Sequence, residues 1–459
     1  MSSLIENCTF DIINAIINHL EPDAIRNLRL SCKTLSIKSS STHGVKALFQ
    51  SKHVELTERA LRACAEGTQA GGLYCLIKEL ALSSTAGGDG DAPRRTRQGR
   101  VQLWRKNKDS LLIQSFIALK INGPTGRLAS LSLKVAVPPD LKANIQPANA
   151  RVEYDWRPLS EAAVDAFYTT FRALATSQLR IESLNLFNGP GQQRRSLPCN
   201  ALSKVDWDSE GLAESLSSMR SLSISLSNRV YKLDEDEYGH VRTDNGTTRG
   251  SRRSHHEEED VSIAQDERNF TGLASLFQLL KNLEGFELHY FRLRGELQGL
   301  PSPRDWCHER LLQHLVTLNS LPNLTRSTLR GIYATEANLL AFIKRTRVSE
   351  LSLQSVTLSS GTFRSIFDYC TSAATPITKL DFDVLYEMGA RPAHMVLFLG
   401  AGRSRLGYDA VGLGSESLER GGDDINQPIY YHTPQPPPIG SPVMSRWVTF
   451  RHKEYGSMW

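Results

Sequence analysis

Few residues in this sequence combine the types and spacing that catalysis requires. Cys307 and His308 pair a nucleophile with a base, but adjacent residues of a helix do not face each other, so we interpret Cys307 as a packing residue. Residues 412–414 (Gly-Leu-Gly) lack the preceding strand and following helix of a phosphate-binding loop. His255 and His256 lie in an acidic run without the spacing of a metal site. We therefore expect a non-catalytic protein with no cofactor and no metal.

The cysteines point to a reducing compartment. Seven are scattered along the chain, and no two have the two-residue spacing that presents paired thiolates to zinc. We expect free thiols, as in cytoplasmic or nuclear proteins. Charged Glu6 and Asp11 interrupt the first twenty residues, and no run of eighteen apolar residues occurs. We expect neither secretion nor a membrane partner.

A basic segment at residues 94–108 allows three interpretations. It holds seven Arg and Lys residues, no acidic residue, and Trp104. Such a strip can bind phosphate backbones, with the indole stacking on a base, or can serve as a nuclear-import signal. We favour a third interpretation, a solvated insertion, because charge runs are common in inserts of this kind. Nucleic acid is therefore an alternative partner but not the expected one.

Length and composition describe a globular protein larger than one small module. The chain has 459 residues, of which 40% are hydrophobic and 22% charged, as in folded proteins. Lys and Arg exceed Asp and Glu by 54 − 49 = +5, which by itself indicates no partner.

One short pattern recurs along the chain: an apolar residue, two variable residues, then apolar, variable, apolar. The alternation at its end predicts a short strand with two apolar side chains on one face. The eight copies begin at Ile77, Leu128, Ile181, Met219, Leu283, Leu324, Val348 and Ile377, and only Ser327 breaks the pattern.

Amphipathic helices are predicted between these strands. Leu273, Leu276, Phe277 and Leu280 have the spacing of one helical face, and other copies are preceded by similar stretches. The last copies are 24 and 29 residues apart, close to the length of a leucine-rich repeat. We predict an α/β fold in which residues 48–398 form an irregular leucine-rich-repeat solenoid of parallel strands and helices.

Three segments are predicted to be disordered from their polar, Gly-rich or Pro-rich composition. They are two insertions at 83–110 and 229–268, and most of the tail at 399–459.

Residues 4–47 predict a separate all-helical module, because apolar stripes at helical spacing stand on both sides of a Pro-Asp interruption. We expect Thr9 to cap the first helix. So small a module has little core of its own, so part of its apolar surface should be shared with a partner. The alternative is a cap that covers the open end of the solenoid.

This module resembles an F-box, and the layout resembles that of fungal F-box proteins. The similarity rests on the stretches 8–13 (CTFDII) and 28–35 (LRLSCKTL), with Ile16, Leu20 and the Glu-Pro-Asp turn at 21–23 between them. At the opening, Cys8 and Thr9 replace the Leu-Pro of the family, at the corner that the family uses against its adaptor. An adaptor-independent scaffold therefore stays open as an alternative.

The resemblance implies a substrate receptor of a cullin-RING ubiquitin ligase. The F-box would bind the Skp-type adaptor, and through it a cullin, while the repeats would hold an unidentified target protein. The expected adaptor-binding residues are Ile12, Ile13, Ile16, Leu20, Pro22, Ile25, Leu28 and Leu30.

The target would lie on the concave face of the solenoid, where strand residues alternate with the buried ones and point toward a partner. The expected substrate-binding residues are Lys134, Asn185, Ser223, Glu287, His289, Ser352, Gln354, Asp381 and Asp383.

Overall fold

The structure of the chain is a computed structural model. It describes residues 7–40, 42–70, 72–86, 98–138, 157–189, 195–227, 266–291, 310–388, 393–408 and 412–434, together with residues 442, 445 and 446.

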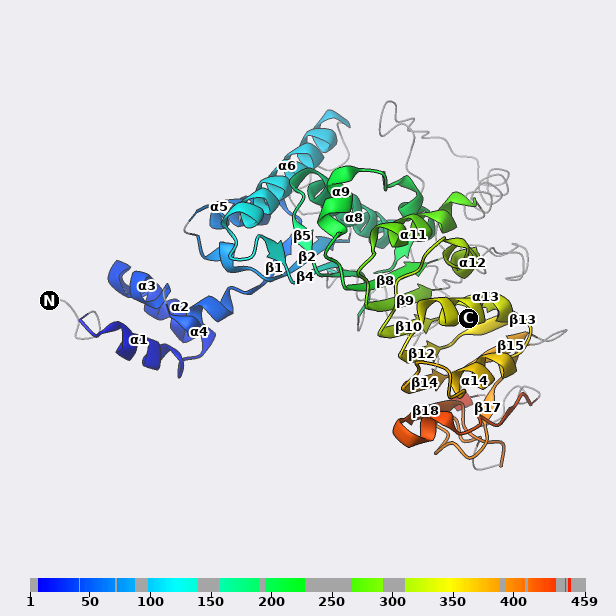
Figure 1. Ribbon diagram of the computed structural model, residues 1–459. Coiled ribbons are helices and arrows are strands. Elements are labelled where there is room, and N and C mark those ends of the chain that lie inside the picture. Colours follow the sequence, from blue (N-terminus) through cyan, green and yellow to red (C-terminus); the bar gives the residue numbers. More distant parts are fainter. Residues whose placement is uncertain are drawn as a thin grey trace.

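The molecule is a mixed α/β protein built around one large sheet (Figure 1). Its strands lie side by side in chain order, and all are parallel except the last, which pairs antiparallel with its neighbour. In order across the sheet they are β1 (Ser51–Glu55), β2 (Glu79–Thr85), β4 (Ser130–Ala136), β6 (Ser183–Leu186), β8 (Ser221–Ser227), β9 (Gly285–Phe291), β10 (Arg326–Arg330), β12 (Glu350–Gln354), β14 (Lys379–Asp383) and β18 (Ser417–Gly421), with β7 (Leu197–Pro198) beside β8.

The eight strands predicted from the apolar pattern are all present and in one register. Leu80 of β2 is paired with Leu131 of β4, Leu131 with Leu184 of β6, and the series continues to Leu380 of β14. These side chains are buried, because the period of two directs them all to the same face. At the one exception the side chain of Ser327 is also fully buried, and its hydroxyl has no hydrogen-bond partner among the described residues.

The residue that follows each of three successive strands has the same unusual backbone conformation. Gly331, Ser355 and Val384 come directly after β10, β12 and β14, and all have positive φ, between 53° and 69°. Gly331 and Ser355 donate their backbone N–H to the last carbonyl of the next strand, and Val384 donates to the carbonyl of Glu416 just before β18, at 2.8 to 2.9 Å. At Gly331 a Cβ atom would lie 2.3 Å from the carbonyl oxygen of Tyr290, so this copy of the turn requires glycine.

A second, smaller sheet follows these turns. Its order is β11 (Tyr333–Thr335), β13 (Thr357–Ser360), β15 (Tyr386–Met388) and β16 (Ala393–Met395). Two further pairs are β3 (Arg127–Leu128) with β5 (Arg180–Ile181), and β17 (Leu397–Phe398) with β19 (Tyr431–His432).

Helices cover one face of the large sheet and lie on the outer side of its curve, with the strands on the inner side (Figure 1). Thr57 and Thr335 cap two of them by accepting the backbone N–H of Ala60 and Asn338. The helices are α5 (Glu58–Gly67), α6 (Gln98–Asn122), α8 (Arg157–Ser177), α9 (Glu210–Leu216), α11 (Arg268–Leu279), α12 (Arg310–Thr317), α13 (Glu336–Thr346) and α14 (Arg364–Cys370), with short 3-10 turns at Leu73–Leu76, Cys199–Lys204 and Gly422–Asn426.

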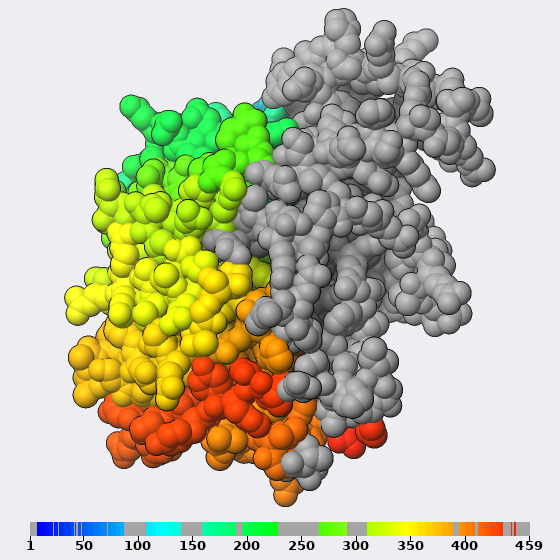
Figure 2. Space-filling view, turned by 90° about the vertical axis from the view of Figure 1, so that its right-hand side faces the viewer, coloured from blue at the N-terminus to red at the C-terminus, as the bar shows by residue number. Residues whose placement is uncertain are grey.

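One hydrophobic core runs between the helices and the sheet from Val54 to Ile425. Aromatic side chains pack against one another in this core, as Phe277 does edge to face against Phe286 with ring centroids 4.7 Å apart. Figure 2 shows the successive segments stacked in chain order from green to red. Each unit is therefore covered by its immediate neighbours in the sequence.

The N-terminal helices form a unit with a core of its own. They are α1 (Phe10–Ile17), α2 (Pro22–Ser31), α3 (Lys33–Ser40) and α4 (His43–Leu48), and they lie apart from the helical layer in Figure 1. Ile13, Ile17, Ile25, Leu35 and Val45 fill this core.

Two of the three segments predicted to be disordered are partly ordered, and that prediction was wrong for them. Within 83–110, Ser83 to Thr85 complete β2 and α6 begins at Gln98. Within 399–459, β18 pairs with β14, and its Leu418 is buried in the main core. Tertiary contacts order these polar stretches in spite of their composition. The predicted insertion 229–268 lies outside the described residues up to position 265.

Candidate functional site

The N-terminal module exposes large apolar side chains. The structure describes nine exposed large hydrophobic residues in all, and the five in this module are Phe10, Ile12, Leu30, Ile37 and Leu48. Leu30 is 73% exposed and Ile37 61% exposed. Five large apolar side chains exposed on so small a unit are typical of a module that binds another protein. We call these five residues the apolar module surface.

The residues predicted to bind an adaptor divide into two groups. Ile12 and Leu30 belong to the apolar module surface, and Ile16, Leu20 and Leu28 are partly buried. Pro22 is the first residue of α2.

The prediction was wrong for Ile13 and Ile25, which are 0% and 6% exposed. Both fill the core of the module, because a helix in a four-helix unit turns one side of its apolar stripe inward. A partner can contact only the residues on the outer side of that stripe.

The opening corner of the module is held by α3. The Nζ atom of Lys38 donates a hydrogen bond of 2.9 Å to the carbonyl oxygen of Cys8, and the Cys8 side chain packs against the module core. The predicted capping by Thr9 is not found, because its side chain makes no cap hydrogen bond to α1. Cys8 thus has a packing role at the start of the module.

The polar face of the large sheet carries the predicted substrate-binding residues in two rows. Asn185, Ser223, Glu287, Ser352 and Asp381 belong to the first row, in which each residue is the register partner of the next or is separated from it by Thr328 of β10. All are partly buried.

Hydrogen bonds run along this first row from strand to strand. The hydroxyl of Ser223 accepts from Asn188 Nδ2 at 2.8 Å and donates to Glu287 Oε2 at 3.0 Å. The hydroxyl of Ser352 donates to Asp381 Oδ2 at 2.9 Å. The structure thus brings together residues that are up to 64 positions apart in the sequence.

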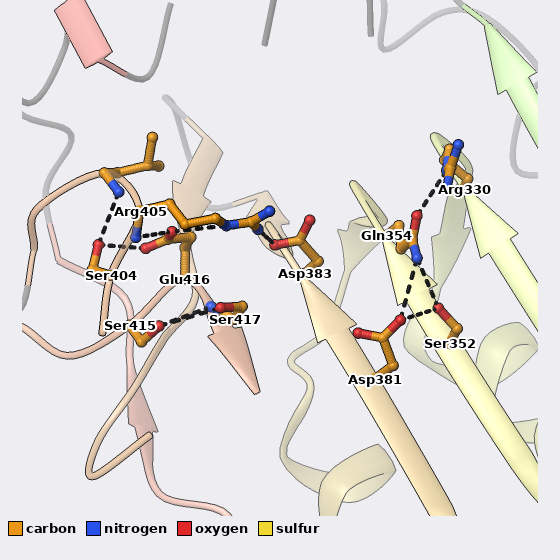
Figure 3. A network of polar contacts seen from close by, with 11 residues as sticks. Arg330, Ser352, Gln354, Asp381, Asp383, Ser404, Arg405, Ser415, Glu416 and Ser417 are labelled. Carbon is orange, nitrogen blue, oxygen red and sulfur yellow. Dashed lines mark hydrogen bonds and ion pairs between the residues drawn. The ribbon is translucent and has the colours of Figure 1, made fainter. Parts of the chain in front are cut away.

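The second row contains Lys134, His289, Gln354 and Asp383, together with Arg330. Lys134 is exposed. Gln354 accepts from Arg330 Nε at 2.8 Å and donates to Ser352 Oγ at 3.1 Å and to Asp381 Oδ2 at 3.3 Å, so it joins the two rows (Figure 3).

His289 is the one predicted substrate-binding residue that a partner cannot reach. Its side chain is 3% exposed, and its ring lies against Phe291. The carboxyl-terminal halves of β8 and β9 are buried on both faces, which overrides the alternation from which exposure was predicted. Burial, and secondarily the charge of Arg330, lower the pKa of His289 well below its ordinary value.

Two arginines that were not predicted as site residues, Arg330 and Arg405, complete this face. Arg330 occupies in β10 the position that Gln354 has in β12, so the register of the copies was a sufficient signal for it. Arg405 lies in the segment predicted to be disordered, and no sequence signal pointed to it. It is paired with Asp383 and with the fully buried Glu416, which also accepts the backbone N–H of Arg405 at 2.7 Å (Figure 3).

The basic segment contributes one residue to the interior. Lys108 is 2% exposed, and its Nζ atom lies 2.9 Å from Asp165 Oδ2 of α8. This lysine therefore cannot contact a phosphate backbone. The side chains of 94–106 lie outside the described residues.

Other chemistry finds little support in the described part of the chain. No three His, Cys, Asp or Glu side chains are grouped there as metal ligands. The described cysteines are all free thiols, and burial raises the pKa of Cys199 and of Cys370 to about 12. No described helix is long and apolar enough to span a bilayer. Cys307 and His308 lie outside the described residues.

Neither the known family models nor the curated proteins contain a match to this chain. The resemblance to an F-box therefore depends on residues 8–35 alone.

Proposed function

We propose that this protein is a substrate receptor of a Skp, cullin and F-box type ubiquitin ligase. In this proposal the N-terminal module binds the Skp-type adaptor, and residues from 48 onward form a leucine-rich-repeat solenoid whose inner face binds a target protein. The chain would carry out no chemistry itself, and would act in the cytoplasm or nucleus.

The observation that carries the proposal is the apolar module surface. A module with a core of five buried residues still leaves five large apolar side chains exposed, which costs solubility unless a partner covers them. The F-box resemblance provides the class of that partner, since Ile12 and Leu30 belong both to the resemblance and to this surface.

The repeat assignment is supported by regularity. Eight parallel strands share one register, and the left-handed residues Gly331, Ser355 and Val384 recur at one position of successive units. Arrays of this kind present an extended inner face to a partner.

The test is co-purification with the Skp-type adaptor of the same organism, comparing Leu30→Asp with Ile121→Asp. Leu30 and Ile121 are each 73% exposed, but Ile121 lies on α6, outside the module. We expect size-exclusion chromatography to show co-elution of the wild type and Ile121→Asp, and its loss in Leu30→Asp. A charge buried in an apolar interface costs several kcal/mol, which is enough to release the adaptor.

Ile12→Asp provides a second variant on α1. Adaptor binding that persists in both Leu30→Asp and Ile12→Asp would contradict the proposal. Separate elution of the folded wild type would instead favour the adaptor-independent scaffold. The replacement of Leu-Pro by Cys8 and Thr9 would then explain why the adaptor does not bind.

A further inference from the structure

Two carboxylates on the polar face of the sheet are held by neutral donors and not by cations. Glu287 of β9 accepts from Ser223 on the preceding strand, and Asp381 of β14 accepts from Ser352 and Gln354 on its preceding strand. Among the residues that the structure describes, no Lys, Arg or His lies within ion-pair distance of either carboxylate. Because hydroxyl and amide groups are neutral donors, each carboxylate keeps its negative charge and unused acceptor positions.

The two carboxylates have a defined separation. They belong to the same row, with Thr328 of β10 and Ser352 of β12 between them in register. Three steps between neighbouring strands correspond to about 14 Å. An extended peptide advances about 3.3 Å per residue, so about four residues cover this distance, and residues four apart in an extended chain point to the same side.

The cations on this face differ in how they are paired. Arg405 is paired with Asp383 and Glu416 and is thereby neutralised, whereas Arg330 donates to the neutral Gln354 and keeps its positive charge in the second row (Figure 3). Arg326 of β10 and Lys379 of β14 are exposed on the same face, two residues before Thr328 and Asp381, and Lys379 is paired with Glu419 at 3.5 Å. Positive charge of a partner is therefore favoured directly over the two first-row carboxylates and disfavoured around Thr328, which Arg326 and Arg330 flank.

We propose that the inner face binds an extended segment of a target protein with Lys or Arg at two positions four residues apart, one over Glu287 and one over Asp381. The side chain midway between them lies over Thr328 and Ser352, where a small neutral residue fits. This inference rests on the proposed role of the face in target binding, and names the class of target.

The experiment measures fluorescence anisotropy of labelled peptides with the full chain at about 50 mM salt, where ion pairs are weakly screened. The probe is an extended Gly, Ser and Thr peptide with two arginines four residues apart. The comparison peptides place the arginines two residues apart or replace them with glutamates. We expect the first peptide to bind most tightly and the glutamate peptide not to bind.

The protein variants are Glu287→Gln and Asp381→Asn, which keep an acceptor oxygen for Ser223 and Ser352 while removing the charge. Each should weaken binding of the first peptide about tenfold, the loss of one charge pair. Asp423→Asn is the matched control, because Asp423 is an exposed carboxylate in the turn after β18, outside the first row, and it should leave binding unchanged. Thermal unfolding of each variant verifies that the fold is intact.

Three outcomes would overturn the inference: no saturable binding up to about 1 mM peptide, equal affinity for the glutamate peptide, or unchanged binding in both charge variants. None of these depends on the N-terminal module. Lost peptide binding with intact adaptor co-elution removes only this inference, whereas lost adaptor binding with intact peptide binding removes the receptor proposal.

Discussion

Lys108 Nζ of α6 lies 2.9 Å from Asp165 Oδ2 of α8, and the lysine is 2% exposed. The two residues are 57 positions apart in the sequence and join two neighbouring helices of the outer layer. Removing one member of such a pair takes its compensating charge away from the other, which costs more than the pair itself contributes to stability.

We therefore expect Lys108→Met to lower the free energy of unfolding by about 3 kcal/mol, measured by denaturant titration. The double variant Lys108→Met with Asp165→Leu should recover much of this loss, because both members of the ion pair are then removed. The exposed Lys281 supplies the control, and Lys281→Met should change stability by no more than about 0.5 kcal/mol. Equal stability of the two lysine variants would contradict the role of the pair.

The buried imidazole of His289 predicts a loss of stability in acid. Its pKa is lowered in the folded state, so below the ordinary value the unfolded chain binds a proton that the folded chain does not. The contribution of neutral His289 to the free energy of unfolding is therefore fully present above the ordinary pKa of histidine. Below it, this contribution falls with decreasing pH by at most about 1.4 kcal/mol per pH unit until the folded-state pKa is reached.

The measurement is the free energy of unfolding between about pH 7.5 and 5 for the wild type and His289→Gln. The variant should have a flatter profile in this range, because it removes the titrating group. Parallel profiles would show that other groups cause the pH dependence.

Thiol reactivity should follow burial. Burial raises the pKa of Cys199 and Cys370 to about 12, so their reactive thiolate forms are scarce near neutral pH. Cys8 and Cys32 are only partly buried. We expect iodoacetamide at about pH 8 to label Cys8 and Cys32 first, with Cys199 and Cys370 labelled only after addition of denaturant. Peptide mass spectrometry identifies the sites, and early modification of Cys370 would contradict the packing described here.

The strand β18 should protect the last parallel strand from aggregation. It covers the edge of β14, and the side chain of Leu418 is 7% exposed in the main core. Leu418→Asp should detach β18, expose the edge of β14 and cost about 3 kcal/mol or more. We expect lower thermal stability and light scattering from aggregates at moderate temperature. The neighbouring exposed Glu419 gives the control, and Glu419→Gln should behave as the wild type.

Much of the strand and helix layout followed from local pattern. Leu131 and Leu133, or Leu351 and Leu353, have the spacing that only a strand turns to one face, and the structure buries all four. The helical stretch around Leu273 and Phe277 was equally clear, because an amphipathic face must be buried against something.

The candidate site was predicted with less accuracy, because accessibility depends on distant residues. The alternation that predicts an exposed side chain holds for Lys134 but fails for His289, which is buried although it belongs to the same row. In the same way Ile12 and Ile13 are equivalent in sequence, yet only the fold of four short helices decides that one is exposed and the other buried.

By itself, the sequence determined the alternation of helices and strands and the apolar face of each, because periodicity is a property of consecutive residues. Only the tertiary structure decided which polar groups meet. Ser223 reaches Glu287 and Arg405 reaches Asp383 because the strands stack in register and the chain returns along β18. Hydrogen bonds and ion pairs act over a few ångströms in space, and sequence separation says nothing about that distance until the chain has folded.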